Sequence, residues 1–104
     1  MDVVTNWGGQ CFGWVGDDGL FDTNGRHVGQ FYRGIIYAEA GHYLGELRDG
    51  RLITDSNKKD THSWYGFVPN PEPTLGPKDG LKDQPPREMP EGFEDFPSSK
   101  TIAG

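Results

Sequence analysis

Apolar residues in the first two thirds of the chain recur in short runs that are separated by polar residues and glycine-containing turns. When residues 9–68 are aligned with themselves at a shift of 16 residues, four copies fall into register without gaps. A fixed period of this kind indicates a repeat architecture. The apolar columns of the alignment are Phe12, Val28 and Leu44; Val15, Phe31 and Leu47; and Leu20, Ile36, Leu52 and Val68.

Glycine follows the same period. Its columns are Gly9, Gly25 and Gly41, followed by Asn57; Gly13, Gly29 and Gly45, followed by Thr61; and Gly34, Gly50 and Gly66, preceded by Asp18. Each copy predicts two short strands and a two-residue turn, as in strands 27–32 and 35–38 around Arg33-Gly34. Asp49-Gly50 in the third copy is the strongest hairpin signal, because a type I′ turn needs positive φ at both central residues.

Strands that follow one another every eight residues or so, with no helical periodicity, predict an all-β meander. Val3-Val4-Thr5 aligns with the second strand of each copy, so the N-terminal strand can close the ring and remove the open edges. Phe67-Val68 competes for the same place, and both alternatives stay open. We expect an all-β fold in which residues 1–68 form four 16-residue β-hairpin repeats in a pseudo-fourfold closed meander. Residues 59–64 are expected to supply the first strand of the fourth copy.

Composition changes near residue 68. All eight prolines follow this position, whereas all three tryptophans and all four tyrosines precede it. Residues 69–104 are therefore expected to form a Pro-rich extended or disordered tail that is dispensable for the folding of residues 1–68. Within the tail, Phe93 and Phe96 stand among acidic residues and are the candidate anchors for a partner, with a solvated linker as the alternative.

The segment Asp22-Thr23-Asn24-Gly25-Arg26-His27-Val28-Gly29, its relative ending in Tyr43-Leu44-Gly45 and the hairpin glycines resemble the family called 4-fold β-flower proteins. The Pro-rich stretch after the repeats is also similar to that family. The resemblance covers about residues 3–68 and implies four β-hairpins around a pseudo-fourfold axis. It implies no activity and no catalytic motif. The fourth copy departs most from the pattern, because Thr61 replaces a glycine and Ser63 an apolar residue.

Charge and cysteine content exclude several classes of function. The formal net charge of −6 argues against a nucleic-acid partner or an anionic membrane surface, since phosphate neutralisation needs clustered Lys and Arg. A single cysteine rules out an intrachain disulfide and fits a reducing compartment. The N-terminal residues lack the features of a signal peptide, and no apolar run can span a bilayer. We expect a cytoplasmic protein, with self-association left open.

Catalysis, metal binding and a cofactor are not expected. The sequence has no Gly-x-Ser-x-Gly motif and no phosphate-binding loop of the Walker type. Glu46 and His62 occupy equivalent positions in neighbouring copies and are the candidate acid–base pair, although solvated neighbours are the favoured interpretation. The possible metal ligands have spacings that match no compact zinc pattern; they are Cys11, His27, His42 and His62.

Binding is the expected function. We expect positions that are alike in all copies to serve the fold, and equivalent positions that differ between copies to be free for function. Residues 1–68 also contain eleven aromatic residues. These differing columns predict a polar-aromatic pocket near the ring axis, with freely varying exposed strand faces as the alternative. The candidate ligand-binding residues are Trp14, Tyr32, Glu46, Arg48, His62 and Trp64.

The expected ligand is a small, anionic, nucleotide-like molecule. Aromatic rings would stack on it, and arginines would hold its anionic group; those near the aromatic residues are Arg26, Arg33, Arg48 and Arg51. One setting for such a protein is a phage inhibitor that sequesters signals of bacterial immunity. The alternative is a protein-interaction or homo-oligomeric assembly module that acts through its tail or an edge strand.

Overall fold

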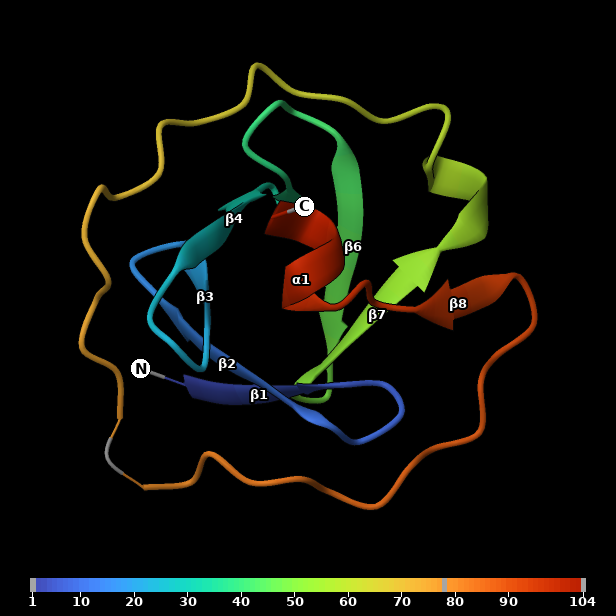
Figure 1. Cartoon of the computed structure of the whole chain (residues 1–104). Helices are drawn as coiled ribbons and strands as arrows, with labels where there is room; N and C mark the ends of the chain where they lie inside the picture. The colour runs from blue at the N-terminus through green and yellow to red at the C-terminus, as the bar shows by residue number, and fades with distance from the viewer. Residues whose placement is uncertain (1, 78, 104) are drawn as a thin grey trace.

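Seven strands close into a barrel and an eighth extends its sheet, in a computed structural model that describes residues 2–77 and 79–103 (Figure 1). The all-β prediction is confirmed. The strands are β1 (Asp2–Asn6), β2 (Cys11–Gly16), β3 (Gly19–Asp22), β4 (His27–Tyr32), β5 (Ile35–Tyr37), β6 (Tyr43–Arg48), β7 (Arg51–Asp55) and β8 (Phe93–Asp95). Two short helices, η1 (Ser56–Lys58) and α1 (Ser99–Ala103), complete the described secondary structure.

The barrel closes between its first and seventh strands. Strands β1 to β7 pair antiparallel in chain order, so an odd number of strands leaves β1 and β7 running in the same direction. These two pair in parallel, with Thr5 opposite Arg51 and Asn6 opposite Leu52. We call this pairing the seam. The N-terminal strand therefore closes the ring, whereas Phe67-Val68 belong to no strand.

The 16-residue period is visible in the strands. β2, β4 and β6 begin at Cys11, His27 and Tyr43, and each hairpin turn that follows has positive φ at both central residues. Each of these strands also carries one extra residue opposite its neighbour, at Phe12, Val28 and Leu44. Such bulges re-aim side chains. All three extra residues point into the core of the barrel.

The core consists of two sets of four side chains. One set is Val4, Leu20, Ile36 and Leu52, and the other is Phe12, Val28, Leu44 and Phe96. Phe96 completes the second set because Asp95 pairs with Ile53 in the same way that His27 pairs with Phe21, which places Phe96 in the register of Val28. The fourth position is thus filled from the far end of the chain. The prediction that residues 59–64 form this strand is wrong, since in the structure they lie outside the sheet.

Residues 59–77 and 79–92, which we call the belt, run around the outside of the barrel, opposite in direction to the order in which the strands follow one another (Figure 1). The backbone amides of Trp64, Thr74 and Gln84 donate hydrogen bonds to the carbonyl oxygens of Gly41, Gly25 and Gly9, at 3.0, 2.8 and 2.7 Å. A Cβ atom at any of these three glycines would overlap the belt backbone. The first glycine column therefore serves belt contact as well as turn geometry.

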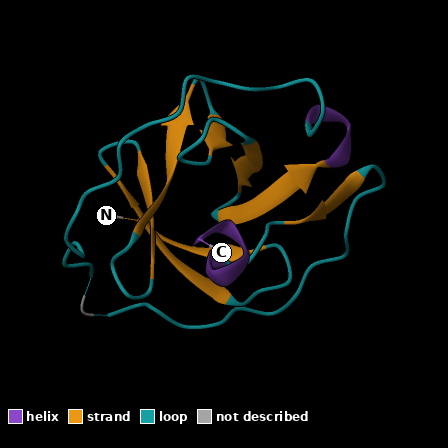
Figure 2. Ribbon diagram, turned by 45° about the horizontal axis from the view of Figure 1, so that its top comes forward, coloured by secondary structure: helices purple, strands orange, loops and turns teal. Residues whose placement is uncertain are grey.

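The last residues return from the belt to the barrel. β8 pairs with β7, Phe96 enters the core, and α1 lies at the centre of the ring of strands, where Ile102 packs on the core (Figures 1 and 2). The described part of residues 69–104 includes β8 and α1 and supplies Phe96 to the core, so it is not a separate extended or disordered tail. Phe96 is only 3% exposed, and we therefore expect this segment to be needed for folding.

Candidate ligand-binding site

The six predicted ligand-binding residues lie on the outer wall of the barrel or in the belt, and they do not converge near the axis. The bulge after Phe12 turns Trp14 outward, while the core side chains fill the axis. Trp14 is 2% exposed, stacks on Phe21 at a centroid distance of 5.4 Å, and is covered by Gly76 of the belt. The prediction of an axial pocket is therefore wrong.

Tyr32 and Trp64 hold the start of the belt against the second hairpin. Their rings stack at a centroid distance of 5.1 Å, and the ring of Tyr37 lies 5.7 Å from that of Trp64. The guanidinium of Arg33 lies 5.3 Å from the centroid of Tyr32. These two predicted site residues consequently contact each other and belong to the belt interface.

Glu46 belongs to a charged network at the end of the third hairpin. Its Oε2 accepts from Lys58 Nζ at 3.0 Å, and its Oε1 lies 3.5 Å from Arg48 Nη2. Tyr43 Oη donates to Glu46 at 3.4 Å and accepts from the amide of Asp55 at 2.9 Å. Burial is the main cause that raises the pKa of Tyr43 to about 12, which keeps this hydroxyl protonated.

His62 does not act on Glu46. Its Nδ1 lies 2.9 Å from Thr61 Oγ1, and its ring packs 6.0 Å from the ring of Tyr43. The contacts of Glu46 instead go to two cations and a phenol. In the described part of the chain, Glu46 and His62 therefore do not form the candidate acid–base pair.

The two candidate partner anchors in the tail are used within the chain. Phe96 is buried and meets Phe12 edge to face at 5.5 Å. Phe93 is half-buried, and the guanidinium of Arg48 lies 4.5 Å from the centroid of its ring. Phe96 cannot reach a partner without leaving the core, so this assignment is corrected.

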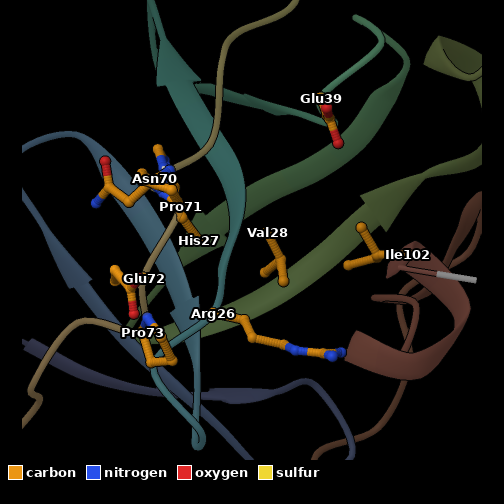
Figure 3. Close-up of a pocket in the computed structure, with 9 residues that line it drawn as sticks. All are labelled: Arg26, His27, Val28, Glu39, Asn70, Pro71, Glu72, Pro73 and Ile102. Carbon is orange, nitrogen blue, oxygen red and sulfur yellow. The ribbon is translucent and has the colours of Figure 1, made fainter.

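A pocket of about 500 Å³ lies between the second hairpin, the belt and α1 (Figure 3). The turn before β4 contributes Arg26, and β4 itself contributes His27 and Val28. Belt residues 70–73 form one wall, and Ile102 of α1 faces Val28 across the apolar part of the lining. Glu39 and Glu72 add two carboxylates to its lining. The sequence marks Arg26 as one of four arginines that could hold an anionic group, and His27 as one of four possible metal ligands. It does not predict this pocket, because the 16-residue period contains no information on where the belt lies.

The charged groups of this pocket are available to a ligand. Arg26, Glu39 and Glu72 are exposed side chains, and no ion pair among the described residues includes them. Arg26 extends along the pocket toward α1 (Figure 3). One cation and two carboxylates around an apolar surface can bind a molecule that carries both an acidic group and N–H donors.

His27 supports the wall of the pocket. Its Nδ1 accepts from the amide of Asn70 at 3.2 Å, so the proton of the neutral ring is on Nε2, which lies 3.1 Å from Gln30 Oε1. The ring also stacks between Phe21 and Phe67, at 5.0 and 4.6 Å. With both nitrogens bonded, His27 fixes the belt to β4 and has no free nitrogen for proton transfer.

Cys11 has the environment of a structural residue. Burial, together with the nearby carboxylate of Asp83, raises the pKa of its thiol above the usual value. Its backbone amide donates to Asp83 Oδ1 at 2.8 Å. A thiol with a raised pKa is a poor nucleophile at neutral pH, because little thiolate is present.

Two features are absent from residues 2–77 and 79–103. No group of three or more His, Cys, Asp or Glu side chains in this part of the chain is placed to hold a metal ion. Nor does any helix described there combine the length and apolar character needed to cross a membrane.

Comparison with known proteins identifies a family model. The model described as 4-fold beta flower protein matches residues 1–100. Comparisons with curated proteins and with solved structures found no match. The matched span includes the barrel, the belt and Phe96, so the belt lies within the same family match as the strands.

Proposed function

Because the chain belongs to the 4-fold beta flower protein family, a match that names a fold and no activity, we propose its function from the pocket of Figure 3. The protein is a non-catalytic binding protein for a small organic molecule. The ligand lies between the second hairpin, belt residues 70–73 and α1. It carries an acidic group at one end and N–H donors elsewhere, as nucleotide-like molecules do.

One observation carries this proposal: charged groups without ion-pair partners among the described residues surround an apolar surface. Arg26 can hold a carboxylate or phosphate through two parallel hydrogen bonds. Glu39 and Glu72 can accept from amino groups, and Val28 and Ile102 offer contact to an apolar ring or chain. The volume of about 500 Å³ is within the range of small-molecule sites, roughly 300–1,000 Å³.

A binding role without catalysis is supported by the state of His27. It is the one histidine among the described residues that line the pocket, and both of its ring nitrogens are already bonded. A general base needs a free nitrogen within reach of the substrate. The described lining residues also include no serine, threonine or cysteine nucleophile.

Native mass spectrometry of the purified full chain tests the proposal, since it detects a co-purifying small molecule together with the oligomeric state. The identified molecule is then titrated by calorimetry. Arg26→Gln is expected to weaken binding by about 10- to 100-fold, the value of a charge-assisted hydrogen bond pair. Arg33→Gln is the matched control, because Arg33 is exposed at a hairpin turn away from the pocket and should leave affinity unchanged. Equal affinity of Arg26→Gln and the wild type would refute the pocket.

The assembly alternative would have to use other residues than Phe93 and Phe96. Three apolar side chains among the described residues of the belt, Tyr65, Val68 and Leu75, are at least 90% exposed. Light scattering after size exclusion at increasing concentration measures self-association, and Tyr65→Ser with Leu75→Ser should abolish it if these side chains form the contact. A monomer at all concentrations would exclude the homo-oligomer.

We also infer that the barrel is built from pseudo-fourfold hairpin repeats. Three hairpins at a 16-residue spacing support this interpretation. Val4 and Phe96, each in register with its column, supply the fourth unit from the two ends of the chain.

A further inference from the structure

A second pocket, separate from that of Figure 3, lies at the seam. It has a volume of about 300 Å³ and is strongly polar in its lining residues. The barrel side consists of β1 and the β6–β7 turn with the start of β7, and the belt side consists of residues 80–87. The lining residues are Val3, Thr5, Asp49, Gly50, Arg51, Gly80, Lys82, Gln84 and Arg87.

Arg51 is a buried cation without a counter-ion in the described residues. It is 9% exposed, and no carboxylate lies within ion-pair distance of it. Its guanidinium has five N–H donors, and the described chain provides one acceptor, the carbonyl oxygen of Trp7 at 3.1 Å from Nη1. Burying a charge without a partner is costly, so buried charges in proteins are normally paired. The remaining donors therefore favour an anion in the pocket.

Thr5 supplies an independent observation at the same place. Its Oγ1 is buried and has no hydrogen-bond partner within the described residues, and the residue is 5% exposed. Thr5 stands opposite Arg51 in the parallel pairing of the seam, and both residues line the pocket. A buried hydroxyl without a partner is uncommon in a native protein. An anion in this pocket can accept the missing hydrogen bond.

The belt brings two more cations to the pocket. Lys82 is exposed, and Arg87 Nη1 bonds to Asp49 Oδ2 at 3.2 Å while its guanidinium lies 5.5 Å from the centroid of Trp7. Among the described lining residues, Asp49 is the one carboxylate, and its side chain is 77% exposed. With three cations and one carboxylate, this described lining has an excess of positive charge in a chain of net charge −6.

We propose that the seam pocket binds a small phosphate-class oxyanion, held by Arg51, the hydroxyl of Thr5 and Lys82. Arginine matches the paired oxygens of a tetrahedral oxyanion, and lysine adds a point charge. No aromatic side chain is among the described residues that line the pocket, so these residues offer a nucleoside base no ring to stack on. The site is distinct from the proposed organic-ligand pocket in its residues and in its ligand. Because its cations come from both barrel and belt, the anion also joins the belt to the seam.

Thermal unfolding and calorimetry with inorganic phosphate and with pyrophosphate test the proposal on the full chain after dialysis into phosphate-free buffer. The melting temperature of the wild type should rise with probe concentration and saturate, as expected for a ligand that binds the folded state. Sodium chloride at equal ionic strength should have a smaller effect. A response to phosphate alone indicates a single-phosphate site, and a stronger response to pyrophosphate indicates a diphosphate group; both support the proposal.

Three variants separate a binding site from a structural arginine. Arg51→Met keeps the apolar stem of the side chain, so in phosphate-free buffer its melting temperature should be no lower than that of the wild type. Its melting temperature should not rise when phosphate is added, whereas that of the control Arg33→Met should rise as in the wild type. Lys82→Gln and Thr5→Val should weaken phosphate binding, the former by about tenfold, while leaving the melting temperature in phosphate-free buffer unchanged or higher. If Arg51→Met does not fold, these two variants decide.

The proposal is overturned if phosphate and pyrophosphate stabilise the wild type no more than chloride does. It is also overturned if Arg51→Met, or both Lys82→Gln and Thr5→Val, respond as the wild type does. Arg26 lies outside the seam pocket, so the result with Arg26→Gln tests the organic-ligand pocket separately.

Discussion

The rings of Phe12 and Phe96 meet edge to face at a centroid distance of 5.5 Å inside the barrel, although they come from opposite ends of the chain. Phe12 is the bulge residue of β2, and its side chain points into the core. Phe96 directly follows β8, which comes after the belt in the sequence. Their contact joins the first copy of the repeat to the residues that complete the fourth. Stability of the barrel therefore depends on the tail.

Phe96→Ala should lower the free energy of unfolding by about 3–5 kcal/mol, because it removes a buried ring and leaves a cavity. Urea denaturation followed by tryptophan fluorescence measures this change. Phe93→Ala is the matched control, since Phe93 is half-buried beneath Arg48 and should cost about 1 kcal/mol or less. A chain that ends at Pro69 should fail to give a cooperative melt. A stable truncated barrel would show that Phe96 is not needed.

Gly25→Ala should destabilise the protein more than Gly34→Ala does. Both glycines have positive φ, 84° and 80°, so the backbone strain of an alanine is similar at the two sites and amounts to about 1–2 kcal/mol. A Cβ at Gly25 would overlap the carbonyl oxygen of Thr74, whereas nothing lies within 4 Å of one at Gly34. The difference between the two free energies of unfolding thus measures the belt contact. Equal losses would mean that the belt can move aside freely.

Ile36→Asp should unfold the barrel. Ile36 is fully buried within the ring of Val4, Leu20 and Leu52, and a buried carboxylate without a partner costs several kcal/mol against a total stability of about 5–15 kcal/mol. Leu47→Asp is the control, because Leu47 belongs to another apolar column and is 37% exposed. Circular dichroism melts should show a cooperative transition for Leu47→Asp and none for Ile36→Asp. If Ile36→Asp melts as the wild type does, the assignment of Ile36 to the core is wrong.

Tyr43 predicts a loss of stability at alkaline pH. Burial raises its pKa from 10.0 to about 12, so the unfolded chain releases this proton first. Its contribution is complete below pH 10 and disappears as the pH rises through about 12. Tyr43→Phe should lose about 1 kcal/mol at pH 8 with the bond from the Asp55 amide, but should then fall less steeply than the wild type between pH 10 and 11. Parallel slopes in urea denaturation would contradict the assignment.

The repeat predicted much of the barrel because residues in one column of the alignment occupy equivalent positions in the structure. Leu20, Ile36 and Leu52 are fully buried, and Asp49-Gly50 forms the positive-φ turn that its residues indicate. The alignment of Val4 with this column likewise allowed closure by the N-terminal strand. The sequence left Phe67-Val68 open as the alternative, and the pairing of β1 with β7 decides between the two. These predictions depend on neighbours in sequence or on a fixed shift, which a single sequence reveals directly.

The fourth member of the second core column could not be found in this way. One period beyond Leu44 the sequence has Asp60, so the column ends in a polar residue, and its continuation at Phe96 lies after the whole belt. The period contains no information on a strand that is supplied out of order. A fixed-shift alignment therefore assigned the wrong segment to the fourth hairpin.

The columns that differ between copies do not converge on an axial pocket, for a related reason. Trp14, Tyr32 and Glu46 differ between copies, yet Gly76 covers Trp14, Trp64 stacks on Tyr32, and Lys58 pairs with Glu46. The segment after β7 passes each hairpin once with a different sequence, so the wall beneath it must differ as well. Asymmetry in the repeat reflects what covers each copy.

The completion of the core by Phe96 has a consequence for synthesis. A ribosome makes the chain from its N-terminus, so the first three hairpins emerge while the residues that fill the fourth position are still untranslated. Until then, the apolar faces of Phe12 and Leu52 have no cover from that side. Contacts between such distant residues form slowly, and uncovered apolar surface favours aggregation. Ribosome-bound chains of this protein should therefore be substrates for chaperones up to the translation of Phe96.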